Sequence, residues 1–434
     1  MVNTVLESYY PKTFRKEISQ NLGYYLKNRQ TIIMIGMRRV GISNFLRFFL
    51  SHKKVIDKHI PNRKKHLFIH VDLNDLVERE VFPFWMLTLK RIVDNCERLN
   101  LEPKIKKYVE NLFLDSIQSK DLFLLFDCVR LSLIKITQAG FIPTMFLIHF
   151  DRIKDAVTPE LFANLESLYD ATNHQLTYVL TSFRSLDQLA PKAFSQASPA
   201  LIVYQMYVKT AEPKDLETIY KVNTRKYNLH LPKKFKEELF AFSGGYIQYL
   251  LLALITLSEK IKILNKNFEL FPALIEDERI ALQSEELWDS LNETEQDTLI
   301  QIVSKEKISK DGQLSSKYLW DTGLVATEKG KTRIFSPIFE NFIKSRQTNG
   351  AKPLEMPPLE LSKKEHLLFT CLQNNLNQIC EREAIIEAVW PEEEELGVSD
   401  WAIDRLVARV RSKLKQQNSS YEIVTVKTRG YKLI

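Results

Sequence analysis

Residues 398–415 read VSDWAIDRLVARVRSKLK, and this stretch decides the fold of the C-terminal part of the chain. Its apolar residues recur at spacings of three and four, which places them on one side of an amphipathic helix and predicts that this side is buried. Ser399 is a good N-cap and Asp400 adds an acid to the first turn, so the helix is expected to begin there. The predicted buried side comprises Ile403, Leu406, Val407, Val410 and Leu414.

The remaining sides of this helix are basic, and a basic hairpin follows it. Residues 421–434 read YEIVTVKTRGYKLI, which predicts two short strands around a turn at residues 427–430. From Trp401 to the C-terminus the chain has eight Lys and Arg residues against two acids. A cationic helix followed by a cationic hairpin offers one element to the major groove of a duplex and another to a neighbouring groove or phosphate.

Four segments of this region resemble, in order and spacing, the motifs of the winged helix-turn-helix output domain of OmpR-type response regulators. The resemblance covers roughly residues 354–434 and implies double-stranded DNA as a partner. The departures from the family pattern are small: Thr428-Arg429 replaces the usual wing glycine and its neighbour, and Val410 stands where Leu is common. The four segments are Leu361–Leu368, Arg382–Trp390, Ile403–Leu414 and Thr425–Leu433.

The candidate DNA contacts fall into three groups. Residues on the outward face of the helix suit base edges or nearby phosphates, more lateral bases suit phosphates, and residues of the hairpin turn suit a neighbouring groove. Arg429, at the tip of the hairpin, fits the negative potential of a narrow minor groove. The alternative is a surface helix whose charges meet only water. The groups are, in that order, Arg405, Arg409 and Ser412; Arg411, Lys413 and Lys415; and Lys427, Thr428 and Arg429.

The N-terminal part of the chain alternates strand-like apolar runs with amphipathic helices, which predicts an α/β fold with a parallel sheet covered by helices. After the first strand comes GMRRVGIS, residues 36–43, and then a helix. Two glycines let several backbone N–H groups point at one phosphate, and the helix N-terminus adds its positive end. The expected strands are residues 31–36, 67–72, 144–151, 176–182 and 201–206.

This loop resembles the "G-x-R-R-V-G-K-[ST]" phosphate loop of AAA-like ATPases of the signal-transducing (STAND) and archaeal types, with Ile42 in place of the lysine. Asp151, after the third strand, takes the Walker B position, and Arg152 stands where hydrolysing members place a second acid. The turn at residues 243–248 resembles the family's "GG-x-P" turn, without its proline. The resemblance covers about residues 23–254. It implies nucleotide contacts at Gly36, Arg38, Arg39, Gly41, Ser43, Asn44 and Asp151, with Ser43 and Asp151 as ligands of Mg²⁺ if a Mg-nucleotide binds.

The missing lysine bears on activity. A lysine here pairs with charge that develops on the transferred phosphoryl group, an interaction of the kind worth several kcal/mol. Ile42 cannot replace it, and the direction of Arg38 and Arg39 cannot be read from sequence. We therefore favour a scaffold without nucleotide over nucleotide binding without turnover, and both over an active ATPase. The cofactor stays open, with ATP or ADP and Mg²⁺ as the candidates.

The chain of 434 residues is expected to hold several domains. Residues 284–346 resemble the winged helix that follows the ATPase core in archaeal-type AAA proteins. The expected fold is thus a P-loop NTPase-like (AAA/STAND) core with a helical lid, followed by two winged-helix domains. The expected boundaries are 1–210 for the core, 211–283 for the lid, 284–346 for the first winged helix, 347–358 for a linker and 359–434 for the OmpR-type domain.

The composition of the chain argues against several classes of protein. The net charge of +7 is modest, and no apolar run approaches the roughly 18–20 residues of a membrane span. The first residues are too polar for a signal peptide. The four cysteines lack a CxxC or a metal-like spacing with histidine, so reduced, packed thiols and no metal site are expected in a cytoplasmic protein. We expect His149 to be a core histidine, and the sequence suggests no Ser-His-Asp set.

These patterns favour a DNA-binding regulator, and among such regulators they favour a transcription factor. Its degenerate ATPase-like module would serve oligomerisation or the sensing of a protein partner. The alternatives are an active STAND/AAA ATPase that remodels its substrate or initiates replication, an adaptor of a mobile element or defence system, and a scaffold whose winged helices bind proteins.

Overall fold

The computed structural model describes residues 6–99, 101–196, 203–260, 268–328, 330–350, 361, 363–390, 400–416, 421–426 and 429–434. The chain forms two compact units, Met1–Asn349 and Gly350–Ile434. Each has its own hydrophobic core among the described residues. The two units are therefore described separately.

The first unit is built on a five-stranded sheet in the order β2-β3-β4-β1-β5, and its neighbouring strands all pair in parallel. The predicted α/β fold and parallel sheet are confirmed. The third strand is shorter than predicted, because the backbone leaves the extended region at His149, whose φ is 58°. The strands are β1 (Ile32–Ile35), β2 (His66–Asp72), β3 (Ile142–Ile148), β4 (Thr177–Ser182) and β5 (Tyr204–Tyr207).

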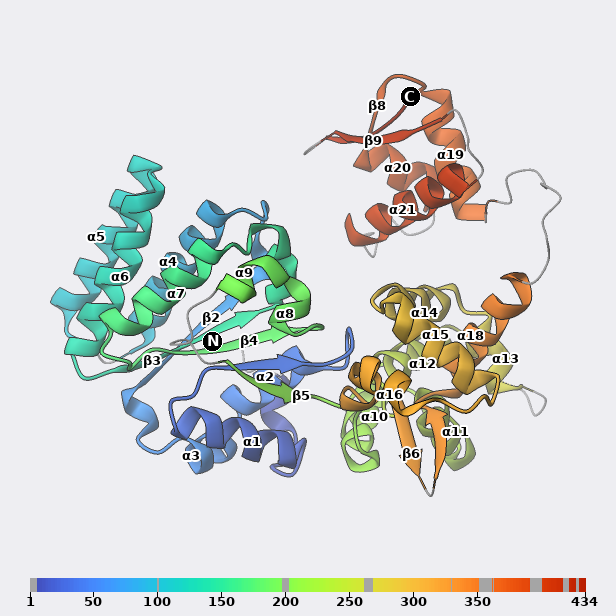
Figure 1. The fold of residues 1–434 in the computed structure, drawn as a ribbon, viewed down its shortest axis with the longest axis horizontal. Helices are drawn as coiled ribbons and strands as arrows, with labels where there is room; N and C mark the ends of the chain where they lie inside the picture. The colour runs from blue at the N-terminus through green and yellow to red at the C-terminus, as the bar shows by residue number, and fades with distance from the viewer. Residues whose placement is uncertain are drawn as a thin grey trace. The chain divides into compact units, whose positions relative to one another are not determined.

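Helices cover this sheet, lying above and below it in the view of Figure 1. The coverage explains why β1 and β4 are buried along their whole length, as central strands of parallel sheets are. Between β2 and β3 the chain inserts three long helices, of which α4 packs on β2 and α6 on β3. The helices of this part are α1 (Lys16–Lys27), α2 (Ile42–Ser51), α3 (Lys53–His59), α4 (Val81–Arg98), α5 (Pro103–Ser119), α6 (Leu122–Gln138), α7 (Pro159–Ala171), α8 (Leu186–Leu189) and α9 (Pro191–Gln196), with short 3₁₀ helices η1 (Leu6–Tyr9), η2 (Arg63–Lys65), η3 (Leu73–Asp75) and η4 (Phe150–Ala156).

The strand order sets the position of any ligand site. From β1 the chain crosses to β2 at the far edge and returns through β3 and β4, whereas β5 lies on the other side of β1. In open parallel sheets, ligands bind outside the carboxyl ends of the strands where the strand order reverses. The loop that follows β1 lies at that point.

The rest of the first unit is helical and carries one antiparallel hairpin, β6–β7. Helix α18 continues to Gly350, so the first four residues of the predicted linker are helical, and residues 351–358 lie outside the described part. These elements are α10 (Pro213–Lys226), α11 (Lys233–Ser243), α12 (Ile247–Lys260), α13 (Leu270–Ile275), α14 (Glu278–Asp289), α15 (Glu293–Val303), α16 (Lys310–Ser315), α17 (Lys317–Asp321), β6 (Val325–Glu328), β7 (Lys331–Ile334) and α18 (Pro337–Gly350).

The second unit packs three helices against a three-stranded antiparallel sheet of order β8-β10-β9. This is the helix-and-hairpin arrangement of a winged helix, as predicted. The proposed N-cap Ser399 lies outside the described residues, and the helix begins at Asp400. The elements are α19 (Lys363–Asn374), β8 (Ile379–Glu381), α20 (Arg382–Val389), α21 (Asp400–Gln416), β9 (Ile423–Val426) and β10 (Gly430–Leu433).

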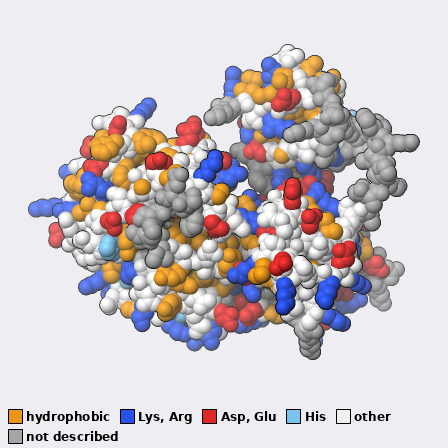
Figure 2. All heavy atoms as spheres, in the orientation of Figure 1, with side chains coloured by type: hydrophobic (Ala, Val, Ile, Leu, Met, Phe, Trp, Pro, Cys, Tyr) orange, Lys and Arg blue, Asp and Glu red, His pale blue; other side chains and the backbone are white. Residues whose placement is uncertain are grey.

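Among the described residues, no helix is both long enough and apolar enough to cross a membrane. Figure 2 shows acidic and basic side chains interspersed over the visible face of the first unit.

Candidate nucleic-acid interface and phosphate loop

Helix α21 has the two-sided character that its sequence predicts. All five residues of the predicted apolar stripe are buried, each no more than 3% exposed. Asp404, Ala408 and Ser412 are exposed, and they recur at spacings of four, so they mark the outward face. Arg405 and Arg409 flank this face and are half-buried. The outward face therefore offers a strip of small and polar residues with arginines beside it.

A buried carboxylate orients two of the predicted DNA-binding bases. Glu365 of α19 is 2% exposed, and its carboxylate lies 3.6 Å from Nε of Arg409 and 2.7 Å from Nζ of Lys413. A buried charge is tolerated when it is paired in this way. Arg409 and Lys413 thus hold α21 against α19 as well as being candidates for contact with DNA.

Arg411 ties the same helix to the wing sheet, which consists of β8, β9 and β10. Its Nε donates to the carbonyl of Ile423 and its second amino group donates to Oγ1 of Thr425, both at 2.7 Å. The guanidinium also lies over the Tyr431 ring. These two hydrogen bonds direct the guanidinium of Arg411 toward the protein itself. The sequence predicted only a phosphate contact for Arg411 and gave no sign of this structural role.

A second group of contacts links the outward face of α21 to β10. The hydroxyl of Tyr431 donates to Asp404, and Arg382 forms an ion pair with the same carboxylate at 2.8 Å. Burial, followed by the nearby Asp404, raises the pKa of Tyr431 to about 12. The hydroxyl therefore stays protonated and keeps donating at neutral pH.

The tip of the wing is described in part. Arg429 is exposed and precedes β10. Gly430 has a φ of 150°, and a Cβ at this residue would lie 2.0 Å from the carbonyl oxygen of Cys380 on β8. Glycine is therefore required for β8 and β10 to approach each other. The predicted contacts Lys427 and Thr428, and the side chain of Lys415, lie outside the described residues.

The loop after β1 has the backbone of a phosphate loop but lacks its lysine. Gly41 has a φ of 102°, a conformation that glycine adopts readily, and α2 begins at the next residue, Ile42. The first N–H groups of a helix lack partners within the helix, so this loop retains backbone donors that an anion could use. Ile42 packs against the hydrophobic core, and it supplies no substitute for a lysine.

The two arginines of this loop are directed at a carboxylate from another part of the unit. Glu286 of α14 lies 2.9 Å from Nε of Arg39 and 3.7 Å from an amino nitrogen of Arg38, and its side chain is only 9% exposed. The guanidinium of Arg38 also stacks on Phe183, 3.9 Å from the ring centroid. Glu286 thus pairs with both loop cations and offsets part of their positive charge, and its own negative charge disfavours a phosphate there.

The serine of the loop contacts a histidine. The Oγ atom of Ser43 lies 3.2 Å from Nε2 of His149, and Nδ1 of His149 lies 2.8 Å from Oδ1 of Asp72. Burial raises the pKa of Asp72, but hydrogen bonds from His149 and from the N–H of Asn74 outweigh burial, so the net pKa is lowered. The side chain of His149 is 35% exposed, so the expectation of a core histidine is wrong. A hydrogen-bonded Ser-His-Asp set exists here although the sequence suggested none.

Asp151 lies beyond the end of β3. It lies in η4, three residues beyond the end of β3, while His149 is the residue after β3 that contacts Ser43. Burial raises the pKa of Asp151, and the nearby Arg38 opposes that shift. A role for Asp151 as a Mg²⁺ ligand therefore remains a prediction.

The double-glycine turn packs on the hairpin of the same unit. A Cβ at Gly244 would lie 1.8 Å from the carbonyl oxygen of Phe335, and one at Gly245 would lie 2.5 Å from that of Ala211. The hydroxyl of Tyr246 donates to the carbonyl of Arg38 at 2.7 Å. This turn thus fixes the phosphate loop against the helical part.

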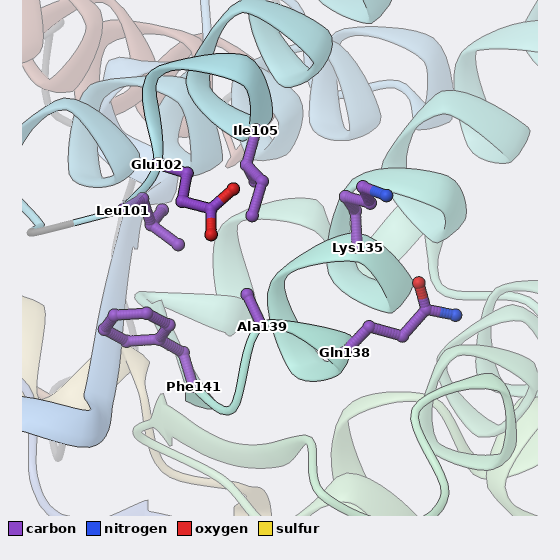
Figure 3. Close-up of a pocket in the computed structure, with 7 residues that line it drawn as sticks. All are labelled: Leu101, Glu102, Ile105, Lys135, Gln138, Ala139 and Phe141. Carbon is purple, nitrogen blue, oxygen red and sulfur yellow. The ribbon is translucent and has the colours of Figure 1, made fainter.

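A hollow of about 360 Å³ lies elsewhere, between the start of α5 and the end of α6 (Figure 3). Its polar lining side chains are the carboxylate of Glu102, the amine of Lys135 and the amide of Gln138. None of the predicted site residues lines it. The lining residues are Leu101, Glu102, Ile105, Lys135, Gln138, Ala139 and Phe141.

The second unit is a winged helix-turn-helix DNA-binding domain, and the first unit has a P-loop NTPase-like fold. Residues 356–433 match the family model described as "Transcriptional regulatory protein, C terminal". The C-terminal domain is therefore the DNA-binding domain of a transcriptional regulator. No curated protein matches the chain.

Solved structures similar to the chain include three archaeal proteins. A Walker-type ATPase of Pyrococcus abyssi is 15% identical, with a TM-score of 0.46, and the match covers 78% of this chain and 100% of that one. The ORC2 protein of Aeropyrum pernix is 13% identical, with a TM-score of 0.41 and coverage of 77% and 95%. The ORC1 protein of Aeropyrum pernix, in complex with DNA, is 10% identical, with a TM-score of 0.36 and coverage of 99% and 91%. These TM-scores are low, and the fold of the first unit follows from its own strand order and loop.

Proposed function

We propose that this protein is a cytoplasmic transcriptional regulator that binds specific double-stranded DNA through α21 and the wing, and whose P-loop NTPase-like body does not hydrolyse nucleotide. The body serves instead as a platform for a second copy of the chain or for a protein partner. The observation that carries the proposal is the arrangement around the phosphate loop, where Ile42 replaces the lysine and Glu286 pairs with both loop arginines.

A nucleotide phosphate and Glu286 would compete for the same two arginines of the loop. A nucleotide phosphate would have to take Arg38 and Arg39 from Glu286, which is largely buried and would be left without these partners. Leaving a buried charge uncompensated costs several kcal/mol. The donors of the α2 N-terminus contribute too little alone to offset this cost, since interactions with a helix terminus are typically worth about 0.3–1 kcal/mol.

The test combines DNA selection with nucleotide measurements on the purified full chain. We expect enrichment of a DNA sequence from a random pool, and no turnover of ATP. We also expect no binding of ATP at about 1 mM by calorimetry with Mg²⁺. In the double variant Ile42→Lys, Glu286→Gln, which restores the lysine and removes the competing charge, ATP binding should become measurable. Steady ATP turnover by the unaltered protein, abolished by Asp151→Asn, would instead establish the active-ATPase alternative.

The Ser43–His149–Asp72 chain favours a second candidate function, ester hydrolysis by a nucleophilic serine. Nδ1 of His149 lies 2.8 Å from Oδ1 of Asp72 and 2.7 Å from the side-chain amide nitrogen of Asn74. With the Nδ1 proton directed at Asp72, Nε2 can accept the Ser43 proton, which is the arrangement that activates serine in hydrolases. The unpartnered N–H groups at the start of α2 could stabilise an oxyanion. A fluorophosphonate probe tests this function: labelling of Ser43 that is lost in His149→Asn supports it, and labelling no faster than in Ser43→Ala excludes it.

A further inference from the structure

The DNA-binding domain contains two thiols in contact. Cys371 lies on α19 and Cys380 on β8, and their sulfur atoms are 3.7 Å apart. Both cysteines are free. A disulfide bond needs a separation of about 2.05 Å, so the sulfurs would have to approach by less than about 2 Å.

The two thiols differ in access. Cys380 is 3% exposed and its sulfur also points at the carbonyl oxygen of Cys371. Cys371 is half-buried, so an outside reagent meets it first. The remaining cysteines, Cys96 and Cys128, are buried in the first unit, 2% exposed each. The chain therefore offers one adjacent pair and two buried thiols for comparison.

We propose that Cys371 and Cys380 form a reversible dithiol–disulfide site that a small-molecule disulfide oxidises. In its oxidised form, the site links α19 covalently to β8 of the wing sheet. The proposal does not rest on DNA binding or on the state of the phosphate loop.

The reaction proceeds by two exchanges. The Cys371 thiolate attacks one sulfur of the small disulfide, forms a mixed disulfide and releases one small thiolate. The Cys380 sulfur then attacks the Cys371 sulfur, expels the second small thiol and closes the protein disulfide. The protein loses two protons and two electrons, and the small disulfide takes up both to become two thiols. A dithiol reductant reverses the sequence.

The site is expected to react slowly. Burial, followed by the neighbouring Cys380, raises the pKa of the Cys371 thiol to about 11, so little thiolate is present at neutral pH. Low thiolate content makes a cysteine a poor sensor of a brief oxidant pulse. The pair would respond to a sustained change of the surrounding thiol pool.

The disulfide would hold the shortest strand of the wing sheet, β8. Strand β8 has only three residues, and Cys380 pairs with Tyr431 of β10 in the register of the sheet. Gly430 of β10 lies directly against the Cys380 carbonyl. Opening of β8 therefore exposes one edge of β10, whose other edge is paired with β9, and a covalent link between β8 and α19 would oppose that opening.

The test uses the full chain, first reduced and then incubated with excess glutathione disulfide until the reaction stops. Peptide mass spectrometry should find Cys371 linked to Cys380 within one chain, with a mass loss of two hydrogens. Hydrogen exchange of the β8 and β10 amides should slow at least tenfold, and dithiothreitol should restore the original rate. Exchange in α2 of the first unit should not change.

The matched variants are Cys371→Ser and Cys380→Ser, each taken through the same treatment. In both variants the link and the slowing of exchange should be absent, and Cys371 of the second variant should stop at the mixed disulfide. Recovery of only the mixed disulfide from the unaltered chain would overturn the proposal. The same holds if the link forms and the exchange of β8 and β10 is unchanged.

Discussion

At the scale of single residues, Arg405 is one of the two arginines of α21 that flank the exposed face formed by Asp404, Ala408 and Ser412. We expect Arg405→Ala to weaken binding to the selected DNA by roughly 1–3 kcal/mol, the range of one base-reading arginine. A fluorescence-anisotropy titration at fixed salt measures the change. Lys234→Ala on α11, an exposed cation in the first unit, is the control and should leave the affinity unaltered. Equal affinity of Arg405→Ala and the unaltered chain would remove Arg405 from the interface.

The ion pair of Arg184 and Glu295 joins the end of β4 to α15. The guanidinium donates to both carboxylate oxygens, one at 2.7 Å and one at 2.6 Å, and these side chains are 9% and 1% exposed. Removal of one partner from a buried pair typically costs about 3–5 kcal/mol, because the other charge stays buried alone. We expect Arg184→Met to lower the stability of the first unit by about that much.

Urea unfolding followed by tryptophan fluorescence measures this loss. The double variant Arg184→Met, Glu295→Met provides the comparison, since it leaves no lone charge and should lose less stability than Arg184→Met. If both variants unfold at the same urea concentration as the unaltered chain, the pair does not hold β4 to α15.

At the scale of elements, the contact between β8 and β10 depends on the absence of a side chain at Gly430. We expect Gly430→Ala to destabilise the second unit by more than about 1 kcal/mol, because strain at a positive φ adds to overlap with the Cys380 carbonyl. The control is Gly330→Ala, at a φ of 75° with open space around the Cβ. It should suffer only the conformational part of the effect. Thermal unfolding monitored by circular dichroism would show the difference, and equal losses would contradict the overlap.

The elements differ in how far sequence alone predicts them. The spacing of Ile403, Leu406 and Val410 predicts α21 and its buried side, because helical periodicity is a local property. The orientation of Arg409 and Lys413 toward Glu365 could not be predicted, since the partner lies on another helix. The glycines of the loop after β1 predict a phosphate loop from sequence. The ion pairs of its arginines could not be predicted, because their partner Glu286 lies on α14, far away in the chain.

The Ser43–His149–Asp72 chain shows the same limit at the edge of the sheet. Asp72 ends β2, His149 follows β3 and Ser43 lies in the first turn of α2, and the strand order β2-β3-β4-β1 brings them together. Their separations in sequence carry no signal of this contact. A prediction of strand order together with strand ends would have found it, because carboxyl ends of parallel strands meet at one edge.

At the scale of the whole molecule, the surplus positive charge lies in the first unit, whereas the DNA-recognition domain is the second unit. Residues 350–434 carry twelve bases and thirteen acids, which leaves forty-nine bases and forty-one acids in residues 1–349. The recognition domain is thus nearly neutral, and its attraction to DNA comes from the placement of its bases after Trp401. The first unit carries the positive surplus, which favours nucleic acid in general without reading a sequence.

This division predicts the behaviour of a chain that ends at Asn349. The first unit has its own core and sheet, so we expect the shortened chain to keep the circular-dichroism spectrum of that unit and its urea transition. It should lose all preference for the selected DNA over a scrambled duplex, while weak, salt-sensitive binding to both remains. Competition binding at two salt concentrations measures both effects. A shortened chain that still prefers the selected sequence would place recognition in the first unit, and the bases of α21 and the wing would then lose the role assigned to them.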